Sequence, residues 1–575
     1  PKHTYCWPCA AMLACLGLAH GLAVERQHQY DAVPQGVIDP SDDVINEAAK
    51  KLPGKLWPLP AWMENGDKTA PVSPGANFFS LSGSTKSSFL TAAFERYQGY
   101  AFPHTANDGS KPSGSQVTGL ELTVEDLDDS HPQLETDESY TLKVPATGGK
   151  AKATSKTVYG ALRALETFSQ LVRFDFDANG YTVPGAPWDI KDAPRFQHRG
   201  LMIDTARHYQ PLASIRAIID SLQYAKLNVL HWHMVDTQSF PFEVKSHPKL
   251  WDAAHLPSQR YTQADVAGIV EYARMRGVRV MVEFDVPGHA ESWCEGEPGM
   301  CLEGGCATEG AATQPLNVAS ETTWTVITDL LKEVTGDKKS TRGKPSGLFP
   351  DNMVHLGGDE VATNCWESDS KMGDFKSKNS LSDGEDLYSY FVSKAGKIAQ
   401  AKGRRPVQWA EAWGAAHTRV KLHKDSIVHV WQSTTNVAEV VADGYDVIIN
   451  VGYFEQSWYL DNLEVNWKDI YSNEPCSDVD DAGCKKILGG HGEMWGETVD
   501  ASNVMHTVWP RLGAIAEKLW SARDATAVEA GAVADGTRAR FRDFRCLLLE
   551  RGVGAAPGEQ PFARSAPEGP GSCAQ

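Results

Sequence analysis

The feature that most restricts the fold is a regular alternation of short apolar segments and helical segments between residues 200 and 490. The apolar segments are rich in branched and aromatic residues, which is typical of buried parallel strands. Most are followed by helical spacing, as at 213–226 and 265–276. The expected strands are 200–204, 228–233, 278–284, 353–357, 406–409, 426–431, 446–450 and 486–490. Eight such units predict an α/β fold, the (β/α)8 TIM barrel.

A different pattern precedes these units. Apolar and polar residues alternate at 119–124 and 140–144, which predicts strands, and 156–168 has helical spacing. Prolines and charged residues at 184–194 predict a linker. We therefore expect a smaller α+β domain over 55–190. The catalytic barrel should cover 195–555, with a C-terminal tail over 556–575.

The first residues and the cysteines predict export. An apolar stretch at 10–19 follows Lys2 and His3, so we expect a signal peptide over 1–24, with a short buried helix as the alternative. Three of the 11 cysteines lie in that segment. The other eight contain no CxxC pair, which favours disulfides over a zinc ribbon. The chain has no Asn-x-Ser/Thr sequence, which is unusual for a secreted eukaryotic enzyme.

Charge and hydropathy exclude two classes of partner. The formal net charge is −19, from 55 basic and 74 acidic residues, which argues against nucleic acid. No apolar run is long enough to span a membrane. We expect neither nucleic-acid binding nor a membrane span.

One stretch stands out for chemistry: Val-His-Leu-Gly-Gly-Asp-Glu at 354–360. Successive side chains of a strand face opposite ways, so Asp359 and Glu360 can share a site only where the backbone turns. Two glycines permit such a turn. A protonated carboxylate would then act as a general acid while its ionised neighbour stabilises positive charge. The plain alternative is a strand end capped by a solvated Asp-Glu pair.

Polar and aromatic residues also follow the other expected strands. Carboxylates, arginine and tryptophan should therefore converge on the C-terminal face of the barrel, where barrel enzymes carry their active sites. Tryptophan faces pack on sugar C–H surfaces, and carboxylates and arginine bind hydroxyl groups. This combination predicts a carbohydrate site and a glycosidase.

These residues lie in motifs that resemble one family. The motifs are His198–Gly200, Asp204–Tyr209, His231–Asp236, Glu283–His289, His355–Glu360 and Met494–Glu497. In this order they resemble the β-N-acetylhexosaminidases of glycoside hydrolase family 20, of the animal lysosomal and fungal type. The resemblance extends from about residue 56 to 554. It implies an exo-acting, retaining enzyme that removes terminal N-acetylglucosamine or N-acetylgalactosamine.

The resemblance assigns roles to the catalytic residues. In this family the 2-acetamido oxygen of the substrate is the nucleophile and forms an oxazolinium ion. Glu360 resembles the general acid and base. Asp359 resembles the carboxylate that orients the acetamido N–H and balances its developing charge. Tyr459 resembles the hydrogen-bond partner of the acetamido oxygen.

The same resemblance assigns residues to substrate binding. Asp236 and His289 would lie behind Glu360 and tune its protonation. Taken singly, the tryptophans would more often be core residues and Arg207 an ion-pair residue. We interpret His355 as a core histidine. The residues implied to wall the pocket or bind hydroxyls are Arg207, Trp409, Trp431, Asp461, Trp495 and Glu497.

The resemblance also implies disulfides. It suggests a C-terminal bridge between Cys546 and Cys573. We expect Cys365 to pair with Cys306 or Cys301, and Cys294 to take the remaining partner. A local Cys476–Cys484 loop is expected as well.

Two positions depart from the family pattern. Thr237 stands where many relatives have a second acid, which puts the support of that loop in doubt. Asn462 follows Asp461 where animal α-type subunits have an arginine that favours acidic sugars. We therefore expect neutral terminal sugars to be preferred over sulfated or sialylated ones.

Three other interpretations compete. His231 and His233 resemble an amidohydrolase metal pair, although such a pair normally ends the first barrel strand. An endo-acting chitinase would need an open cleft. A catalytically inactive sugar-binding protein on the same scaffold would lack the intact Asp359, Glu360 and Tyr459.

The remaining expectations concern partners and location. The partner should be an oligosaccharide or glycoconjugate with a terminal N-acetylhexosamine. No metal or organic cofactor is implied. We expect a homodimer, and export to lysosomes or the extracellular space.

Overall fold

In the computed structural model the chain contains two α/β assemblies, formed by residues 56–192 and by the chain from residue 196 onwards, and each has an apolar core. Trp57 belongs to the core of the second assembly and Trp520 to that of the first. No helix in the described part of the chain is both long and apolar enough to cross a membrane. The proposed signal peptide lies outside the described residues. The structure describes residues 56–83, 86–105, 114–303, 306, 314–336, 347–369, 371–418, 421–433, 435–450, 457–528, 531–558 and 573.

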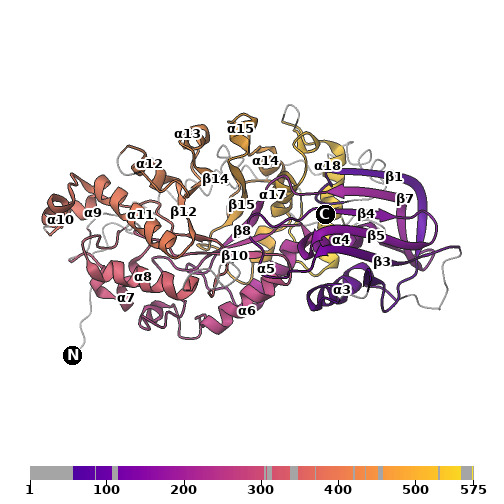
Figure 1. Ribbon diagram of the computed structural model, residues 1–575, viewed down its shortest axis with the longest axis horizontal. Helices are drawn as coiled ribbons and strands as arrows, with labels where there is room; N and C mark the ends of the chain where they lie inside the picture. The colour runs from indigo at the N-terminus through magenta and orange to yellow at the C-terminus, as the bar shows by residue number, and fades with distance from the viewer. Residues whose placement is uncertain are drawn as a thin grey trace, which may run out of the picture. The chain divides into compact units, whose positions relative to one another are not determined.

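The first assembly is a seven-stranded sheet covered by two helices (Figure 1). Its strands run in the order β1-β3-β5-β4-β7-β6, and β2 pairs with β3. The helices are α3 (Ser88–Ala101) and α4 (Val158–Leu171). The strands are β1 (Trp62–Val72), β2 (Phe79–Leu81), β3 (Val117–Asp126), β4 (Tyr140–Val144), β5 (Gly149–Thr157), β6 (Arg173–Asp175) and β7 (Gly180–Asp192).

The linker predicted at 184–194 is wrong, because most of that stretch belongs to β7, which pairs with β1, β4 and β6. Val183, Ala186 and Trp188 of β7 have partners in β1, whereas Pro184 and Pro187 between them do not. Proline has no N–H to donate, so it is tolerated in a strand where pairing is interrupted. The two prolines therefore mark irregular pairing.

Helix α4 connects this sheet to the second assembly. It begins after Thr157, whose hydroxyl accepts the N–H groups of Tyr159 and Gly160. All of its residues are buried, since it lies between the sheet and the barrel (Figure 1). Arg163 of α4 and Arg199 of the first barrel strand both bind Glu138, each at 2.7 Å. Despite burial, these arginines hold the pKa of Glu138 below its ordinary value, so the buried contact is ionic.

The second assembly is a closed barrel, which confirms the predicted fold class. Each strand is parallel to its neighbours, and the order of the strands around the barrel follows the chain. The strands are β8 (His198–Asp204), β9 (Val229–His233), β10 (Arg279–Glu283), β11 (Met353–His355), β12 (Arg405–Trp409), β13 (Ile427–Val430), β14 (Asp446–Ile449) and β15 (Ile487–Met494).

Helices surround the barrel (Figure 1). Their ends follow local sequence signals, such as the capping box of Thr262 and Asp265 at the start of α6. They are α5 (Leu212–Tyr224), α6 (Gln263–Arg274), α7 (Glu291–Gly296), α8 (Glu321–Thr335), α9 (Asn364–Ser368), α10 (Met372–Asn379), α11 (Gly384–Ala401), α12 (Ala410–Thr418), α13 (Val437–Ala442), α14 (Trp467–Ser472), α15 (Asp481–Cys484), α16 (Val504–Val508), α17 (Arg511–Trp520) and α18 (Asp535–Glu550).

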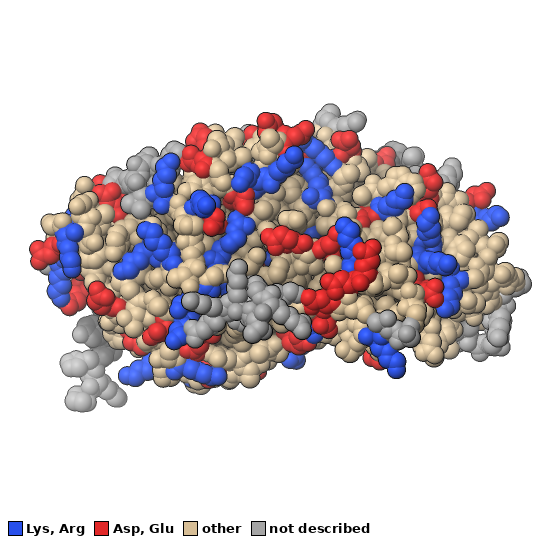
Figure 2. Space-filling model, in the orientation of Figure 1, with Lys and Arg blue, Asp and Glu red and all other residues tan. Residues whose placement is uncertain are grey.

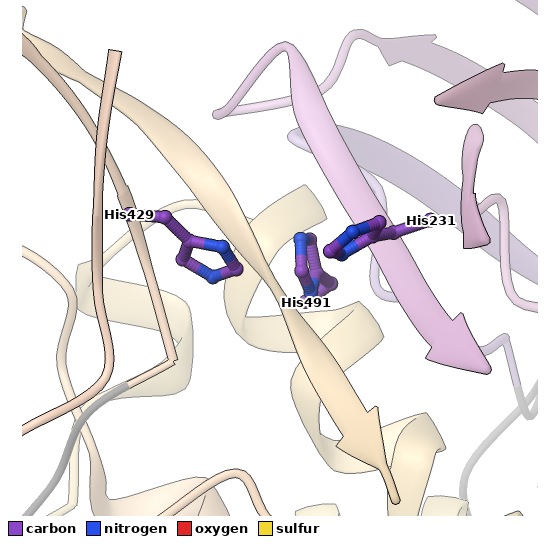
Figure 3. Close-up of side chains that lie close together, drawn as sticks. All are labelled: His231, His429 and His491. Atoms are coloured by element: carbon purple, nitrogen blue, oxygen red, sulfur yellow. The ribbon is translucent and has the colours of Figure 1, made fainter. Parts of the chain in front are cut away.

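The interior of the barrel is layered. An apolar cluster includes Val229 and Met353, the first residues of β9 and β11. Further along the strands, His231, His429 and His491 point toward one another in the interior (Figure 3). Burial lowers the pKa of His231 to about 3 and that of His429 well below its ordinary value. These two imidazoles are therefore neutral core groups.

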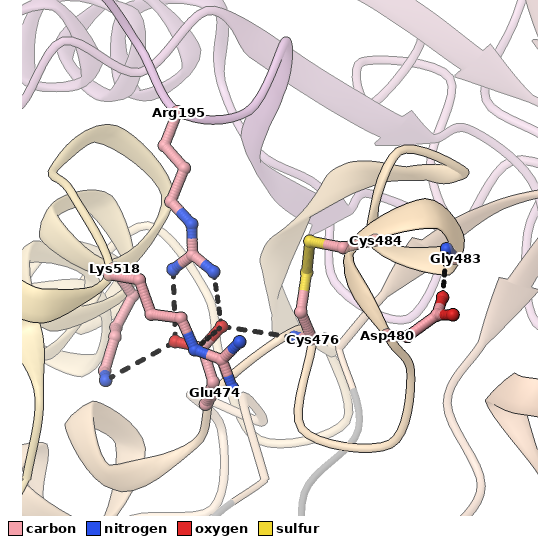
Figure 4. The surroundings of a disulfide bond; sticks show 8 residues. Arg195, Glu474, Cys476, Asp480, Gly483, Cys484 and Lys518 are labelled. Carbon is pink, nitrogen blue, oxygen red and sulfur yellow. Dashed lines mark hydrogen bonds and ion pairs between the residues drawn. A yellow bond between two sulfur atoms is a disulfide. The ribbon is translucent and has the colours of Figure 1, made fainter.

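Ion pairs and a disulfide connect the loop before β15 to the rest of the barrel (Figure 4). Glu474 accepts hydrogen bonds from both terminal nitrogens of Arg195, at 2.5 and 3.1 Å. Glu474 Oε1 also accepts the backbone N–H of Cys476 at 3.2 Å, and Cys476 is joined to Cys484. On the face drawn in Figure 2, basic and acidic side chains are interspersed.

Candidate active site

The turn after β11 brings Asp359 and Glu360 to one cavity. Gly357 and Gly358 have φ of +63° and +104°, and Glu360 also has a positive φ of +49°. A Cβ on Gly357 would lie 1.7 Å from Asp285 Oδ1, so only glycine fits there. The strand ends at His355, and the turn directs both carboxylates into the barrel mouth. Asp359 is buried, whereas half of the Glu360 side chain is exposed.

The cavity has a volume of about 280 Å³. All of the residues that the sequence assigned to catalysis or substrate binding line it, together with His289 and Thr498. Asp236 lies beneath it and is fully buried. The volume is at the lower end of the range of ligand pockets, which suits one sugar unit better than a long chain.

Two tryptophans of the cavity wall are fixed by carboxylates. Trp409 donates its indole N–H to Glu283 Oε1 at 2.9 Å. Trp431 donates to both oxygens of Glu411, at 2.9 and 3.1 Å. One face of the Trp409 ring is stacked on His429, with 4.1 Å between the ring centroids. These contacts hold both indole rings in fixed positions in the cavity wall.

Arg207 is held as a fixed cation at the edge of the cavity. Its Nη1 lies 2.8 Å from Asp204 Oδ2, and its Nη2 lies 2.9 Å from Asp236 Oδ2. Its guanidinium lies over Trp495, and Glu497 Oε1 is 3.7 Å away. Burial opposes the charge, but Asp204 and Asp236 raise the pKa of Arg207 above its ordinary value.

A chain of ion pairs and hydrogen bonds leads from Glu360 into the barrel core. His289 Nε2 lies 3.4 Å from Glu360 Oε2, and its Nδ1 lies 3.1 Å from Asp236 Oδ1. Asp236 Oδ2 contacts His233 Nε2 at 2.8 Å, and His233 Nδ1 contacts Glu283 Oε2 at 2.8 Å. The chain ends on the carboxylate that also anchors Trp409, so Glu283 connects Glu360 to the cavity wall.

Along this series of contacts, negatively and positively charged side chains alternate. Although burial opposes it, Asp359 and the hydrogen bonds of Asp236 and Glu360 raise the pKa of His289 well above its ordinary value. Against burial, the hydrogen bonds of His233 and His289 lower the pKa of Asp236. His289 is therefore an imidazolium that faces Glu360. Its φ of +53° is rare outside glycine and marks a residue held in place by its surroundings.

In the substrate-free site, the pKa shifts of Asp359 and Glu360 run opposite to the protonation states expected from the sequence. The hydrogen bond from His289 lowers the pKa of Glu360, whereas burial raises that of Asp359. Burial and the neighbouring charge of Asp359 raise the pKa of Asp285 well above its ordinary value, so these two buried carboxylates are not both ionised in the substrate-free site. A bound sugar would remove water from Glu360 and favour its protonated form.

Two buried carboxylate oxygens at the cavity have no hydrogen-bond partner. They are Oδ1 of Asp359 and Oδ1 of Asp461. Burial raises the pKa of Asp461 to about 6. Buried polar atoms are rarely left without a partner, and such atoms at a cavity are suited to a polar ligand.

Several contributing residues received no role from the sequence. Asp204 accepts the N–H groups of Ala206 and Gly496 at 2.9 and 3.0 Å, and so connects the ends of β8 and β15. Asp285 also accepts the Gly358 N–H at 2.9 Å. Both residues stand in the motifs Asp204–Tyr209 and Glu283–His289, at or just after the end of a predicted strand, but neither signal shows which groups they contact. The contacts themselves join segments far apart in the chain.

The two departures from the family pattern have structural counterparts. Thr237 donates its hydroxyl hydrogen to Glu291, a carboxylate from α7, so the loop is supported from another element. Below the loop of Asn462, Arg511 donates to the carbonyl oxygens of Asn462 and Val465 at 2.7 and 2.8 Å. Arg511 is not among the described residues that line the cavity.

The eight cysteines within the described residues form four bridges, and Cys365 pairs with Cys306 rather than Cys301. This bridge joins the start of α9, after the catalytic turn, to the segment at 306. Cys294 pairs with Cys301. The other two bridges are Cys476–Cys484 and Cys546–Cys573.

The amidohydrolase interpretation does not fit the geometry. Both nitrogens of His233 contact carboxylates, Glu283 and Asp236. His231 lies in the barrel interior, stacked on His355 with 4.7 Å between ring centroids. His355 is likewise a core residue, and its Nε2 lies 3.2 Å from His429 Nδ1. The HxH pair is therefore part of the interior network.

A closed barrel whose mouth gathers a carboxylate pair, a fixed arginine and tryptophan walls has the architecture of a glycoside hydrolase. Sequence comparison supports the same class. Residues 196–523 match the family described as glycosyl hydrolase family 20, catalytic domain. Residues 56–171 match the pattern described as beta-acetyl hexosaminidase like.

Similar proteins cover most of the chain. Beta-hexosaminidase 1 of Arabidopsis thaliana is 40% identical over 536 residues, 91% of this chain and 94% of that protein. Beta-hexosaminidase subunit beta of Homo sapiens is 35% identical over 525 residues, 87% and 88% of the two chains. The structure of Flavobacterium johnsoniae chitobiase has a TM-score of 0.72 at 28% identity, covering 87% of this chain and 73% of that one.

The chain belongs to glycosyl hydrolase family 20. The predicted family and enzyme class are confirmed. Membership of this β-hexosaminidase family makes the protein a glycoside hydrolase that acts on glycans carrying terminal N-acetylhexosamine.

Proposed function

We propose that this protein is an exo-acting, retaining β-N-acetylhexosaminidase that uses the acetamido group of its substrate as the nucleophile. The observation that carries the proposal is the pairing of Asp359 and Glu360 at one small tryptophan-walled cavity. A cavity of this size accommodates the terminal N-acetylhexosamine and leaves the rest of the glycan outside.

The acetamido group enters beside Asp359 and Tyr459. The unpartnered Oδ1 of Asp359 is available to accept the acetamido N–H. As the acetamido oxygen attacks the anomeric carbon, positive charge develops on the ring that forms, and the buried carboxylate stabilises it. The Tyr459 hydroxyl, at the same cavity, donates to the acetamido oxygen and orients it.

Glu360 transfers the proton in both halves of the reaction. It protonates the leaving oxygen as the bond to the anomeric carbon breaks, and then removes a proton from the water that opens the oxazolinium ion. His289 and Asp236 hold its carboxylate in position through the contacts at 3.4 and 3.1 Å. Arg207, Asp461 and Glu497 bind the sugar hydroxyls.

The charges at this cavity favour a neutral sugar. Asp461 and Glu497 line it, and neither neighbour of Asp461 in sequence is a cation. Arg207 at the same cavity is already paired with Asp204 and Asp236. Glu497 would repel an anionic sulfate or sialic acid, and Asp461, whose pKa is raised to about 6, would add to the repulsion above that pH. We therefore propose neutral N-acetylglucosamine or N-acetylgalactosamine as the terminal sugar.

Hydrolysis of an aryl N-acetyl-β-glucosaminide beside the matching aryl β-glucoside, at mildly acidic pH, tests the proposal. Because the nucleophile belongs to the substrate, the glucoside should be close to inert. Similar rates for both would mean that a protein carboxylate is the nucleophile. If neither substrate is hydrolysed, the alternative of a catalytically inactive sugar-binding protein would be favoured. No feature of the cavity supports that alternative.

Further proposals concern the whole chain. We propose domain limits of 55–190 and 195–555, a signal peptide over 1–24 and export to lysosomes or the extracellular space. Four disulfide bridges suit an oxidising compartment. A homodimer is proposed from the family resemblance alone.

A further inference from the structure

A second cavity, of about 590 Å³, adjoins the first. Glu360 lines both cavities. The second cavity is built by α11, α12, α13 and the loop after the catalytic turn, none of which supplies a hydroxyl-binding residue to the first. It is therefore a separate space that shares only the proposed acid.

Because Glu360 lines both cavities, its role as the acid determines which part of the substrate reaches the second cavity. A general acid must contact the oxygen that it protonates, which is the oxygen joining the terminal sugar to the leaving group. With the terminal sugar in the first cavity, that oxygen lies at Glu360. The next sugar of the chain then extends past Glu360, toward the second cavity.

The second cavity is acidic. Glu360, Glu385, Glu411 and Glu439 line it, and none of its described lining residues is lysine, arginine or histidine. Burial raises the pKa of Glu411 to about 7, and Glu360 carries the proton that it donates, so near pH 5 a cation would be attracted by Glu385 and Glu439. The first cavity, by contrast, contains Arg207 and His289. A cleft lined by charges of one sign concentrates its field and raises the local concentration of the opposite charge.

These carboxylates are held in place by neutral donors. Glu385 accepts the Thr363 hydroxyl at 2.7 Å, and Glu439 accepts the Asn436 side-chain N–H at 2.9 Å. Glu385 and Glu439 are exposed, so they face a ligand that enters from solvent. No cation is paired with either in these contacts.

An aromatic residue and an amide complete the lining. Trp413 is mostly buried, and its indole N–H donates to Asp443 Oδ2 at 3.1 Å. Gln432 donates to Glu411 at 2.9 Å. An indole beside polar side chains is the type of surface on which a sugar ring packs.

We propose that the second cavity binds the leaving group and favours an amino sugar whose 2-amino group is free and protonated. This inference rests on the proposed function, because it takes Glu360 as the acid. A glycan in which N-acetylglucosamine precedes a glucosamine unit is then cleaved faster than its fully acetylated counterpart. A uronic acid in the same place is repelled.

Two disaccharides that differ only at the second sugar test the proposal. They are N-acetylglucosaminyl-β-1,4-glucosamine and N-acetylglucosaminyl-β-1,4-N-acetylglucosamine, assayed near pH 5 at low and at high salt. We expect kcat/KM for the first to be higher by about threefold at low salt, the order of one exposed charge pair. The ratio should approach one at high salt, because salt screens exposed charges.

The variants Glu385→Gln and Glu439→Gln should each lower that ratio at low salt. Glu125→Gln, an exposed glutamate on β3, is the matched control and should leave it unchanged. A ratio of one or less at both salt concentrations would overturn the inference, as would a preference that salt and the two variants do not change.

An aryl N-acetyl-β-glucosaminide assayed beside the two disaccharides separates this inference from the proposed function. If it too is not hydrolysed, the proposed function has failed; if it is hydrolysed, only the inference has.

Discussion

Replacement of Glu360 by glutamine should lower kcat for a disaccharide about 10²–10⁴-fold, the usual contribution of a general acid. Glutamine preserves the shape of the side chain but has no acidic proton to transfer. The neighbouring His289, 3.4 Å away, would keep a hydrogen-bond partner, so the fold around the site should persist. Steady-state kinetics and a thermal unfolding curve for the variant measure both effects.

The leaving group provides the control for this variant. An aryl glycoside whose leaving phenol is strongly acidic needs no proton from the enzyme, so its cleavage step should be far less impaired. Equal losses for both substrates would contradict the acid role. The variant Glu497→Gln at the same cavity should instead raise KM, since Glu497 is proposed to bind a hydroxyl.

Replacement of Asp359 by asparagine should lower kcat about 10²–10³-fold, because a buried charge that stabilises the transition state is lost. The effect should fall on kcat more than on KM, since charge develops on the acetamido group only as the ring closes. Asparagine keeps the shape of the aspartate side chain and retains an oxygen acceptor, so the packing around this position should persist. The unfolding temperature should therefore change little.

The matched control for this second variant is Asp189→Asn on β7. Asp189 contacts Lys143 at 2.8 Å, far from the barrel mouth in the fold, and its replacement should leave kcat unchanged. A loss confined to KM in Asp359→Asn would contradict the proposed role. So would a variant that retains full activity on the acetamido substrate.

The barrel was predictable because its strands are buried on both faces and read as apolar segments. The strand at 228–233 and the helix at 213–226 match β9 and α5 within a few residues. The segment at 184–194 was misjudged, because prolines indicate a break unless the pairing partner is known. Its partner β1 lies more than 100 residues earlier, and the irregular register that accommodates both prolines is a property of the pair.

The residues of the cavity were also predictable, since family motifs and strand ends together identify them. Their protonation was not. The low pKa of Glu360 depends on His289, and the proton position between Asp285 and Asp359 depends on burial. The second cavity was missed for a related reason. Its carboxylates come from α11, α12 and α13, which no local pattern connects to the catalytic turn.

The most direct test of the central claim is a series of aryl β-glycosides whose 2-acetamido group carries zero, one, two or three fluorine atoms. Fluorine withdraws electrons and makes the amide oxygen a weaker nucleophile. If the substrate supplies the nucleophile, kcat/KM should fall steeply with each added fluorine while the leaving group stays the same. A rate that does not change across the series would contradict the account and assign the attack to a carboxylate of the protein.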